Sequence, residues 1–178
     1  MLKKFVGTIA VAAVVFSAAA TQASAQIEKG YTDIGAVIGL GNVGSASAAI
    51  GFRGERIIKE LPDLGNGLLG VGVSLDYYSY GQSSFYNFKV IPIGVTGNYH
   101  FKLENKKIDA FAGAGLGYQI LSCSYTGSGT SIDLCGNSSI YFIGRVGGRY
   151  FVKPNIALYA DAGAGAATLS IGATIKLK

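Results

Sequence analysis

The sequence has no tryptophan, a single histidine and few charged residues, which make up 14% of its 178 positions. Soluble domains contain about 25% charged residues, so a low share is more typical of a membrane protein. After the N-terminal segment, however, no apolar run approaches the ~20 residues that a membrane-spanning helix needs. The sequence therefore excludes a bundle of transmembrane helices and favours a membrane protein built from strands.

The first 25 residues have the features of a cleaved signal peptide. Lys3 and Lys4 precede an apolar core over 5–20, and Ala23 and Ala25 flank Ser24 in a small-residue cleavage site. We therefore expect two segments, a signal peptide over 1–25 and one mature domain over 26–178, and we expect the mature chain to be exported.

Charge gives no indication of a nucleic-acid partner. Without the two lysines of the signal peptide, 13 basic residues remain against 10 acidic residues, and the basic ones are scattered. The nearest cluster, Lys102, Lys106 and Lys107, is interrupted by Glu104 and reads as a solvated turn. We expect no nucleic acid among the partners.

The only two cysteines, Cys123 and Cys135, lie in a segment rich in Ser, Thr and Gly. Because export places the chain in an oxidising compartment, we expect them to form a disulfide that closes this loop. A ring of this size stabilises by ~3 kcal/mol in the chain-entropy model. The pair has no histidine or acidic cluster beside it, so we expect no metal site.

From residue 31 onward the hydrophobic pattern has a period of two. At the C-terminus, for example, Leu169, Ile171 and Ile175 alternate with Ser170, Gly172 and Thr174, as in a strand with one apolar face. The same alternation predicts eight strands, over 31–41, 45–56, 68–80, 86–102, 108–122, 139–152, 156–164 and 168–177.

Charged and polar residues occupy one face of these strands, singly and flanked by Gly and Ala. This face contains Asp33, Arg53, Glu55, Asp76, Asn98, His100, Asp109, Gln119, Arg145, Arg149, Asp161 and Lys176. Outer-membrane barrels alternate lipid-facing with lumen-facing residues, and closure pairs every backbone group, as hydrocarbon demands. The pattern therefore predicts an all-β fold, an eight-stranded antiparallel up-and-down transmembrane barrel with its charges inside. A soluble, lipocalin-like ligand-binding barrel, with the apolar set inside, is the alternative.

Aromatic residues gather near the predicted strand ends. One group contains Tyr77, Tyr80, Phe85, Tyr86 and Phe88, and the other contains Tyr99, Phe101, Tyr150 and Phe151. Two aromatic girdles at the membrane interfaces are expected of such a barrel, although strand propensity alone explains single aromatics as well.

With these strands in place, the last ninety residues resemble the small outer-membrane β-barrel family, which is porin-like and OmpA/OmpX-like. The stretches that carry the resemblance are VTGNYHF at 95–101, DAFAGAGLGY at 109–118, GRVGGRYF at 144–151, NIALYAD at 155–161 and IGATIKL at 171–177. The resemblance implies an outer-membrane location in the cell envelope, with outer-membrane lipids around the barrel.

The resemblance also implies recognition of the last strand by the barrel-assembly machinery during biogenesis. Members of the family usually end on an aromatic residue, whereas this chain ends Leu177-Lys178. Leu177 would then act as the terminal signal residue. The residues expected to carry the signal are Leu169, Ile171, Ala173, Ile175 and Leu177.

An eight-stranded barrel is only wide enough for side chains to fill its interior. We expect a network of lumen charges that pair with one another and plug the barrel, formed by Arg53, Glu55, Asp76, Asp109, Arg145, Arg149 and Asp161. Arg149 and Asp161 are expected to share that network. The function expected is a structural or surface-interaction role, as a monomer with an unidentified surface partner; the alternative is a narrow channel or carrier for small solutes.

We expect no enzymatic activity and no cofactor. Small outer-membrane barrels include enzymes, but a Ser-His hydrolase needs its base beside a nucleophile. His100, by parity, points into the lumen at a strand end, and although Ser170 and Thr174 also point inward, no third residue is identifiable. A structural, hydrogen-bonded histidine is the simpler interpretation.

If the N-terminus lies in the periplasm, the connections after the odd-numbered strands face outward. These are 41–44, 79–84, 123–138 and 163–167, whereas compact turns near Asn105 and Pro154 face the periplasm. Short inner turns and longer outer loops are the rule for such barrels. The link 57–67 is longer than that rule expects.

Overall fold

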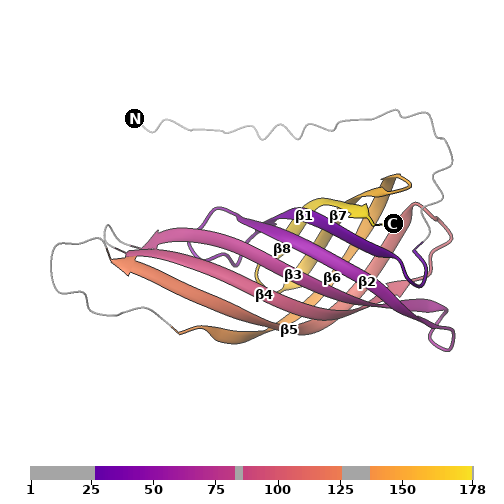
Figure 1. Ribbon diagram of the computed structural model, residues 1–178, viewed down its shortest axis with the longest axis horizontal. Helices are drawn as coiled ribbons and strands as arrows, with labels where there is room; N and C mark the ends of the chain where they lie inside the picture. Colours follow the sequence, from indigo (N-terminus) through magenta and orange to yellow (C-terminus); the bar gives the residue numbers. More distant parts are fainter. Residues whose placement is uncertain (1–26, 83–85, 126–136, 178) are drawn as a thin grey trace, which may run out of the picture.

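The computed structural model describes residues 27–82, 86–125 and 137–177, which form a closed antiparallel barrel (Figure 1). Its strands are β1 Thr32–Leu40, β2 Ala49–Leu61, β3 Gly67–Gln82, β4 Tyr86–Phe101, β5 Ile108–Tyr125, β6 Ser139–Lys153, β7 Ile156–Ala164 and β8 Leu169–Lys176. The segment expected to be the signal peptide lies outside the described residues and remains a prediction.

Each strand pairs with its neighbours in the chain, and β1 pairs antiparallel with β8, which closes the sheet. The closing register runs from Asp33 opposite Lys176 to Leu40 opposite Leu169. The predicted fold, an eight-stranded antiparallel up-and-down barrel, is confirmed. Seven of the eight predicted strands match the observed ones to within three residues at either end.

The second strand is the exception, because it begins and ends later than predicted. It spans Ala49–Leu61 rather than 45–56, and its register with β3 shifts between Ile57 and Lys59. This register shift is a β-bulge, and it interrupts the alternation of apolar and polar residues on which the prediction relied. The prediction therefore assigned residues 57–61 to the connection after the strand. The connection to β3 is therefore only residues 62–66, which turn through positive φ at Gly65 and Asn66. The expected long link was wrong, and this connection is similar in length to the one over 102–107.

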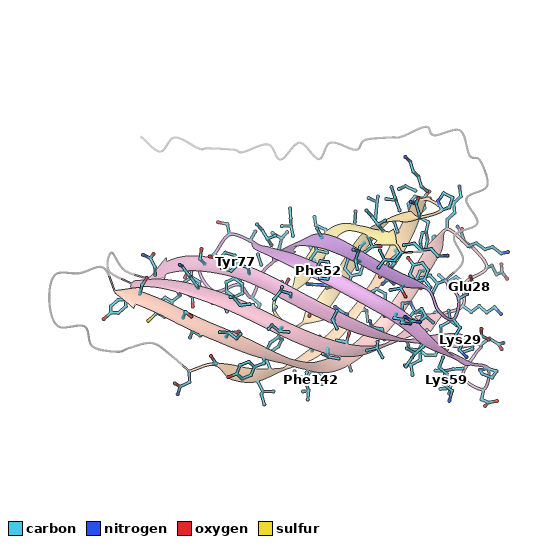
Figure 2. All side chains as sticks on the ribbon, viewed as in Figure 1. Glu28, Lys29, Phe52, Lys59, Tyr77 and Phe142 are labelled. Atoms are coloured by element: carbon cyan, nitrogen blue, oxygen red, sulfur yellow. The ribbon has the colours of Figure 1, made fainter. Side chains whose placement is uncertain are left out.

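The outer face of the wall is apolar. The exposed fractions of Ile50, Ile140 and Phe142 are 72%, 73% and 63%, and Figure 2 shows Phe52, Tyr77 and Phe142 along the wall. A soluble barrel would bury these side chains, so the lipocalin-like alternative does not fit. The described residues contain no helix of the length and apolarity needed to cross a membrane.

The barrel has two unlike ends. At the turn end, β1 begins, β8 ends, and short connections join β2 to β3, β4 to β5 and β6 to β7. Glu28, Lys29 and Lys59 lie there together (Figure 2). At the loop end, β3, β4 and β5 extend beyond the shorter strands β1, β7 and β8 (Figure 1). Exposed charged side chains are concentrated at the turn end, so the two rims differ in chemistry as well as in length.

An apolar cluster closes the inside of the barrel near each end. At the turn end, Tyr31, Ile57, Phe151 and Ala157 are buried together. At the loop end, the buried cluster consists of Val43, Ala49, Tyr78, Val90 and Ala167. The polar residues of the inner face therefore lie between two apolar layers.

The aromatic girdles are only partly as predicted. Tyr77, Phe101 and Tyr150 are on the outer face. The rings of Tyr80 and Phe88, however, stack on each other 5.3 Å apart, and Tyr80 packs against the buried loop-end cluster. Phe151 is 2% exposed and meets Tyr31 edge-on. These rings lie on the inner face by strand parity, which the prediction from strand ends alone did not consider.

Candidate functional site: the charges in the lumen

The inner face carries two separate groups of charged side chains. The turn-end cluster consists of Asp33, Glu55, His100, Asp109 and Arg149, and the loop-end cluster consists of Arg53, Asp76, Arg145 and Asp161. All are placed inside by the period-two alternation of their strands. The outward-facing residues beside them in the strands are mostly apolar.

Arg149 is the centre of the turn-end cluster. Its guanidinium Nη1 donates to Asp109 Oδ2 over 2.7 Å, and its Nη2 donates to a carboxylate oxygen of Glu55. Nε lies 2.8 Å from Asp33 Oδ2, an ion pair without the alignment of a hydrogen bond. One planar cation thus meets three carboxylates, from β1, β2 and β5, at three different nitrogens. The cluster joins strands on opposite sides of the barrel.

His100 completes this cluster. Its Nδ1 lies 2.8 Å from Asp109 Oδ1 and its Nε2 lies 3.0 Å from Glu55 Oε1. Ionised carboxylates only accept hydrogen bonds, so both contacts are hydrogen bonds when the ring is doubly protonated. The partners of His100 are therefore two carboxylates and no hydroxyl, an arrangement that holds charge rather than one that activates a nucleophile.

The loop-end cluster is looser. Arg53 Nη1 lies 2.9 and 3.1 Å from the two oxygens of Asp76, and Arg145 Nη2 donates to Thr96 Oγ1 over 2.8 Å. Asp161 lies 3.8 Å from Arg145 Nη1 and 3.9 Å from Arg53 Nε, distances of ion pairs without hydrogen bonds. The two arginines balance the two aspartates in formal charge.

Several polar atoms beside this looser cluster have no hydrogen-bond partner in the described part of the chain. They are Nε of Arg53, Nε of Arg145 and the hydroxyl of Tyr141. These three residues also line a cavity of about 20 Å³. That space is sufficient for about one water molecule.

An aromatic layer separates the two clusters. The rings of Phe111 and Tyr159 stack 6.0 Å apart and are buried with Val37. Arg149 lies 5.5 Å from the centre of the Phe111 ring, and Arg145 lies 5.8 Å from it. From the turn end to the loop end, the inside of the barrel is therefore apolar, charged, aromatic, charged and apolar.

The seven residues expected to form one lumen network fall into these two groups. Arg149 pairs with Asp33, Glu55 and Asp109, whereas Asp161 lies near Arg53 and Arg145. No ion pair of the described structure joins Arg149 to Asp161, and their expected sharing of one network stays a prediction. Sequence reasoning also left Asp33 and His100 out of the network, although both lie on the polar face of their strands; that position was the available signal.

The other predicted sites have different outcomes. Leu169, Ile171 and Ile175 are exposed on the outer face of β8, as is Leu177 just after it. Cys123 lies near the end of β5, but Cys135 is outside the described residues, so the disulfide stays a prediction.

The fold matches those of solved bacterial barrels. Ail, the attachment invasion locus protein of Yersinia pestis, matches with a TM-score of 0.52 and 11% identity over 84% of this chain and 96% of that one. OprG of Pseudomonas aeruginosa matches at 0.58 with 11% identity, covering 85% and 98%. The N-terminal barrel domain of OprF from the same organism matches at 0.52 with 15% identity, covering 84% and 98%.

No protein-family model and no curated protein matches the sequence. The architecture and the solved structures agree: a closed antiparallel sheet, an apolar outer face and charges inside form the pattern of transmembrane barrels. In its fold the chain is a closed eight-stranded antiparallel barrel, similar to those of these small outer-membrane proteins.

Proposed function

We propose that the protein is a closed barrel of the outer membrane, with a structural or surface-interaction role and no open pore. The observation that carries this proposal is the filling of the lumen. Two clusters of paired charges, an aromatic layer and two apolar clusters occupy the inner face in succession. Paired charges that fill a narrow barrel are a stable alternative to water at membrane depth.

The orientation follows from the connections. Barrels of this type keep short turns in the periplasm and longer loops outside. The turn end, whose connections are residues 62–66, 102–107 and 154–155, then faces the periplasm, and the loop end faces outward. The apolar outer face of β8 supports the proposal that Leu169, Ile171, Ala173, Ile175 and Leu177 are read by the assembly machinery. We infer a monomer surrounded by outer-membrane lipids, with the loop end available to a surface partner.

A narrow channel is the second candidate, and one observation favours it. The donors without partners at Arg53, Arg145 and Tyr141 lie beside a small cavity, so the loop-end cluster is the part of the lumen with room for water. Conduction would require that cluster to rearrange. The turn-end cluster, with its shorter contacts, would still obstruct the path.

Planar-bilayer conductance of the purified barrel tests the two candidates. We expect no ion-conducting steps from the wild-type protein at moderate voltage, and none from Arg145→Ala, because the turn-end cluster remains in place. Reproducible single-channel steps from the wild type, reduced by substitutions at Tyr141 or Arg145, would replace the closed barrel with the channel.

Location and orientation need their own test. The protein should fractionate with the outer membrane and show heat-modifiable migration on gels. An epitope inserted after Gly129 should be labelled on intact cells, and one inserted after Asn105 should not. The reverse labelling would invert the orientation without affecting the fold.

A further inference from the structure

A cavity lies at the turn end, beside the apolar cluster, and Phe151 of that cluster contributes to its lining. Its volume is about 390 Å³, and it is bounded by the β2–β3 turn, the β4–β5 turn and the segment that precedes β1. Small-molecule sites typically have volumes of 300–1,000 Å³. The cavity is therefore large enough for a compact organic ligand, and neither the plug nor the fold accounts for it.

The lining of this cavity is apolar at the sides and charged at the floor. Leu61, Leu68 and Ile108 contribute to the walls. The floor includes His100 and Asp109, which are only 2% and 5% exposed. An apolar enclosure with a few convergent polar groups is the usual composition of a ligand site, where the polar groups fix the orientation of the ligand.

The charges beneath the floor do not balance. Asp33, Glu55 and Asp109 supply three carboxylates, whereas Arg149 and doubly protonated His100 supply two cations. The cluster thus carries one negative charge in excess. The ammonium of Lys176, on the same inner face, lies 5.4 Å from the centre of the Tyr31 ring and forms no ion pair with the cluster in the described structure.

The rim of the cavity adds to this imbalance. Glu28, Glu60 and Glu104 line it, against Lys102 and Lys106. All five of these side chains are exposed to solvent, so charges of both signs are screened alike at the rim. Over the whole lining, the four carboxylates of Glu28, Glu60, Glu104 and Asp109 exceed the cations of Lys102, Lys106 and doubly protonated His100 by one. The lining therefore favours a cationic ligand over one that carries a carboxylate.

We propose that this turn-end cavity binds a small organic cation, an amine with a compact apolar body. The ammonium group approaches the carboxylate of Asp109 at the floor, and the apolar body packs against Leu61, Leu68 and Ile108. A metal ion is a poor occupant, because the described residues contain no His, Cys, Asp and Glu group arranged to hold one. The site does not depend on whether the lumen conducts, so it stands apart from the proposed closed barrel.

Three probes of equal size separate charge from shape: benzylammonium, benzyl alcohol and benzoate. Each is titrated into the full mature barrel in lipid nanodiscs, and binding is followed by NMR shifts of backbone amides. We expect benzylammonium to shift Phe101, Lys102 and Ile108 saturably, benzyl alcohol to bind at least tenfold more weakly, and benzoate not to bind. Equal binding of the three probes, or no saturable shift with any, would overturn the proposal.

Two variants locate the site. Leu61→Trp fills the cavity and should abolish the benzylammonium shifts, whereas Leu64→Trp, in the same turn but outside the lining, should preserve them. If Leu61→Trp binds benzylammonium as the wild type does, the amine binds elsewhere and the proposed site is wrong. Asp109→Asn should weaken benzylammonium binding tenfold or more and leave the binding of benzyl alcohol unchanged. Because Asp109 also bonds Arg149 and His100, the folding of this variant is checked first. If the variant does not fold, the three probes on the wild-type protein decide.

Discussion

Both charged clusters of the lumen combine arginine with carboxylates, but they differ in how closely these groups pair. At the turn end, one arginine and one histidine contact three carboxylates at ion-pair distances of 3.0 Å or less. At the loop end, two arginines and two aspartates are balanced in charge, yet two of their three ion pairs are 3.8 and 3.9 Å long. Balanced charge therefore does not ensure close pairing.

Burial follows the same division. The side chain of Arg149 is 2% exposed, whereas those of Arg53 and Arg145 are each 9% exposed. A charge that is fully removed from water depends entirely on its partners, because the desolvation penalty is large. Substitutions in the turn-end cluster should therefore lower the free energy of unfolding strongly, whereas substitutions in the loop-end cluster should lower it less. Three substitution experiments test this difference.

The largest expected effect is that of Arg149→Ala. It leaves Asp33, Glu55 and Asp109 buried without their shared cation, which should destabilise the barrel by roughly 3–5 kcal/mol. Arg149→Lys should recover little, because one ammonium cannot replace three separate nitrogens. The measurement is reversible urea unfolding in detergent micelles, followed by tyrosine fluorescence and circular dichroism.

Arg145→Ala is the matched control for that experiment. Its guanidinium makes one hydrogen bond, to Thr96, and one long contact to Asp161. Its loss should cost less than half as much as that of Arg149. Equal losses for the two arginines would show that the division into a tight and a loose cluster has no energetic meaning.

Double-mutant cycles examine the boundary between the clusters. Arg149→Ala combined with Glu55→Ala should show a coupling of about 1–3 kcal/mol, because the two side chains are directly bonded. Arg149→Ala combined with Asp161→Ala should show a smaller coupling, below about 1 kcal/mol, because in the described structure the two side chains meet only through Tyr159, whose ring lies 5.7 Å from Arg149 and whose hydroxyl donates to Asp161. Strong coupling in the second cycle would merge the clusters into a single network.

Much of the barrel was predictable from the sequence, because a period of two assigns every strand residue to one of two faces. Asp76, Asp109 and Arg145 could be placed inside without any knowledge of which strands pair. The same rule failed only where it is locally interrupted, at the register shift between Ile57 and Lys59. There the strand continues, but its alternation does not.

The partners of each charge were not predictable in the same way. Glu55 and Arg149 are 94 residues apart and belong to β2 and β6, which are not neighbours in the sheet. Their contact depends on the tilt and stagger of a closed barrel, which fix the height of each side chain in the lumen. Alternation gives the face but not the height, and for that reason Asp161 could not be separated from Arg149 in advance.

The smallest expected effect concerns two hydroxyl groups. Tyr141→Phe removes a hydroxyl that has no hydrogen-bond partner in the described structure, so unfolding should be unchanged or become less favourable by up to about 1 kcal/mol. Tyr159→Phe removes a hydroxyl that donates to Asp161 over 2.5 Å and should destabilise by about 1–3 kcal/mol. Both substitutions keep the ring and both hydroxyls lie at the loop-end cluster, so the comparison isolates the contribution of the hydrogen bond. If Tyr141→Phe proves as costly as Tyr159→Phe, the Tyr141 hydroxyl holds a water in the small cavity beside Arg145, and the loop-end cluster is satisfied through solvent rather than loosely packed.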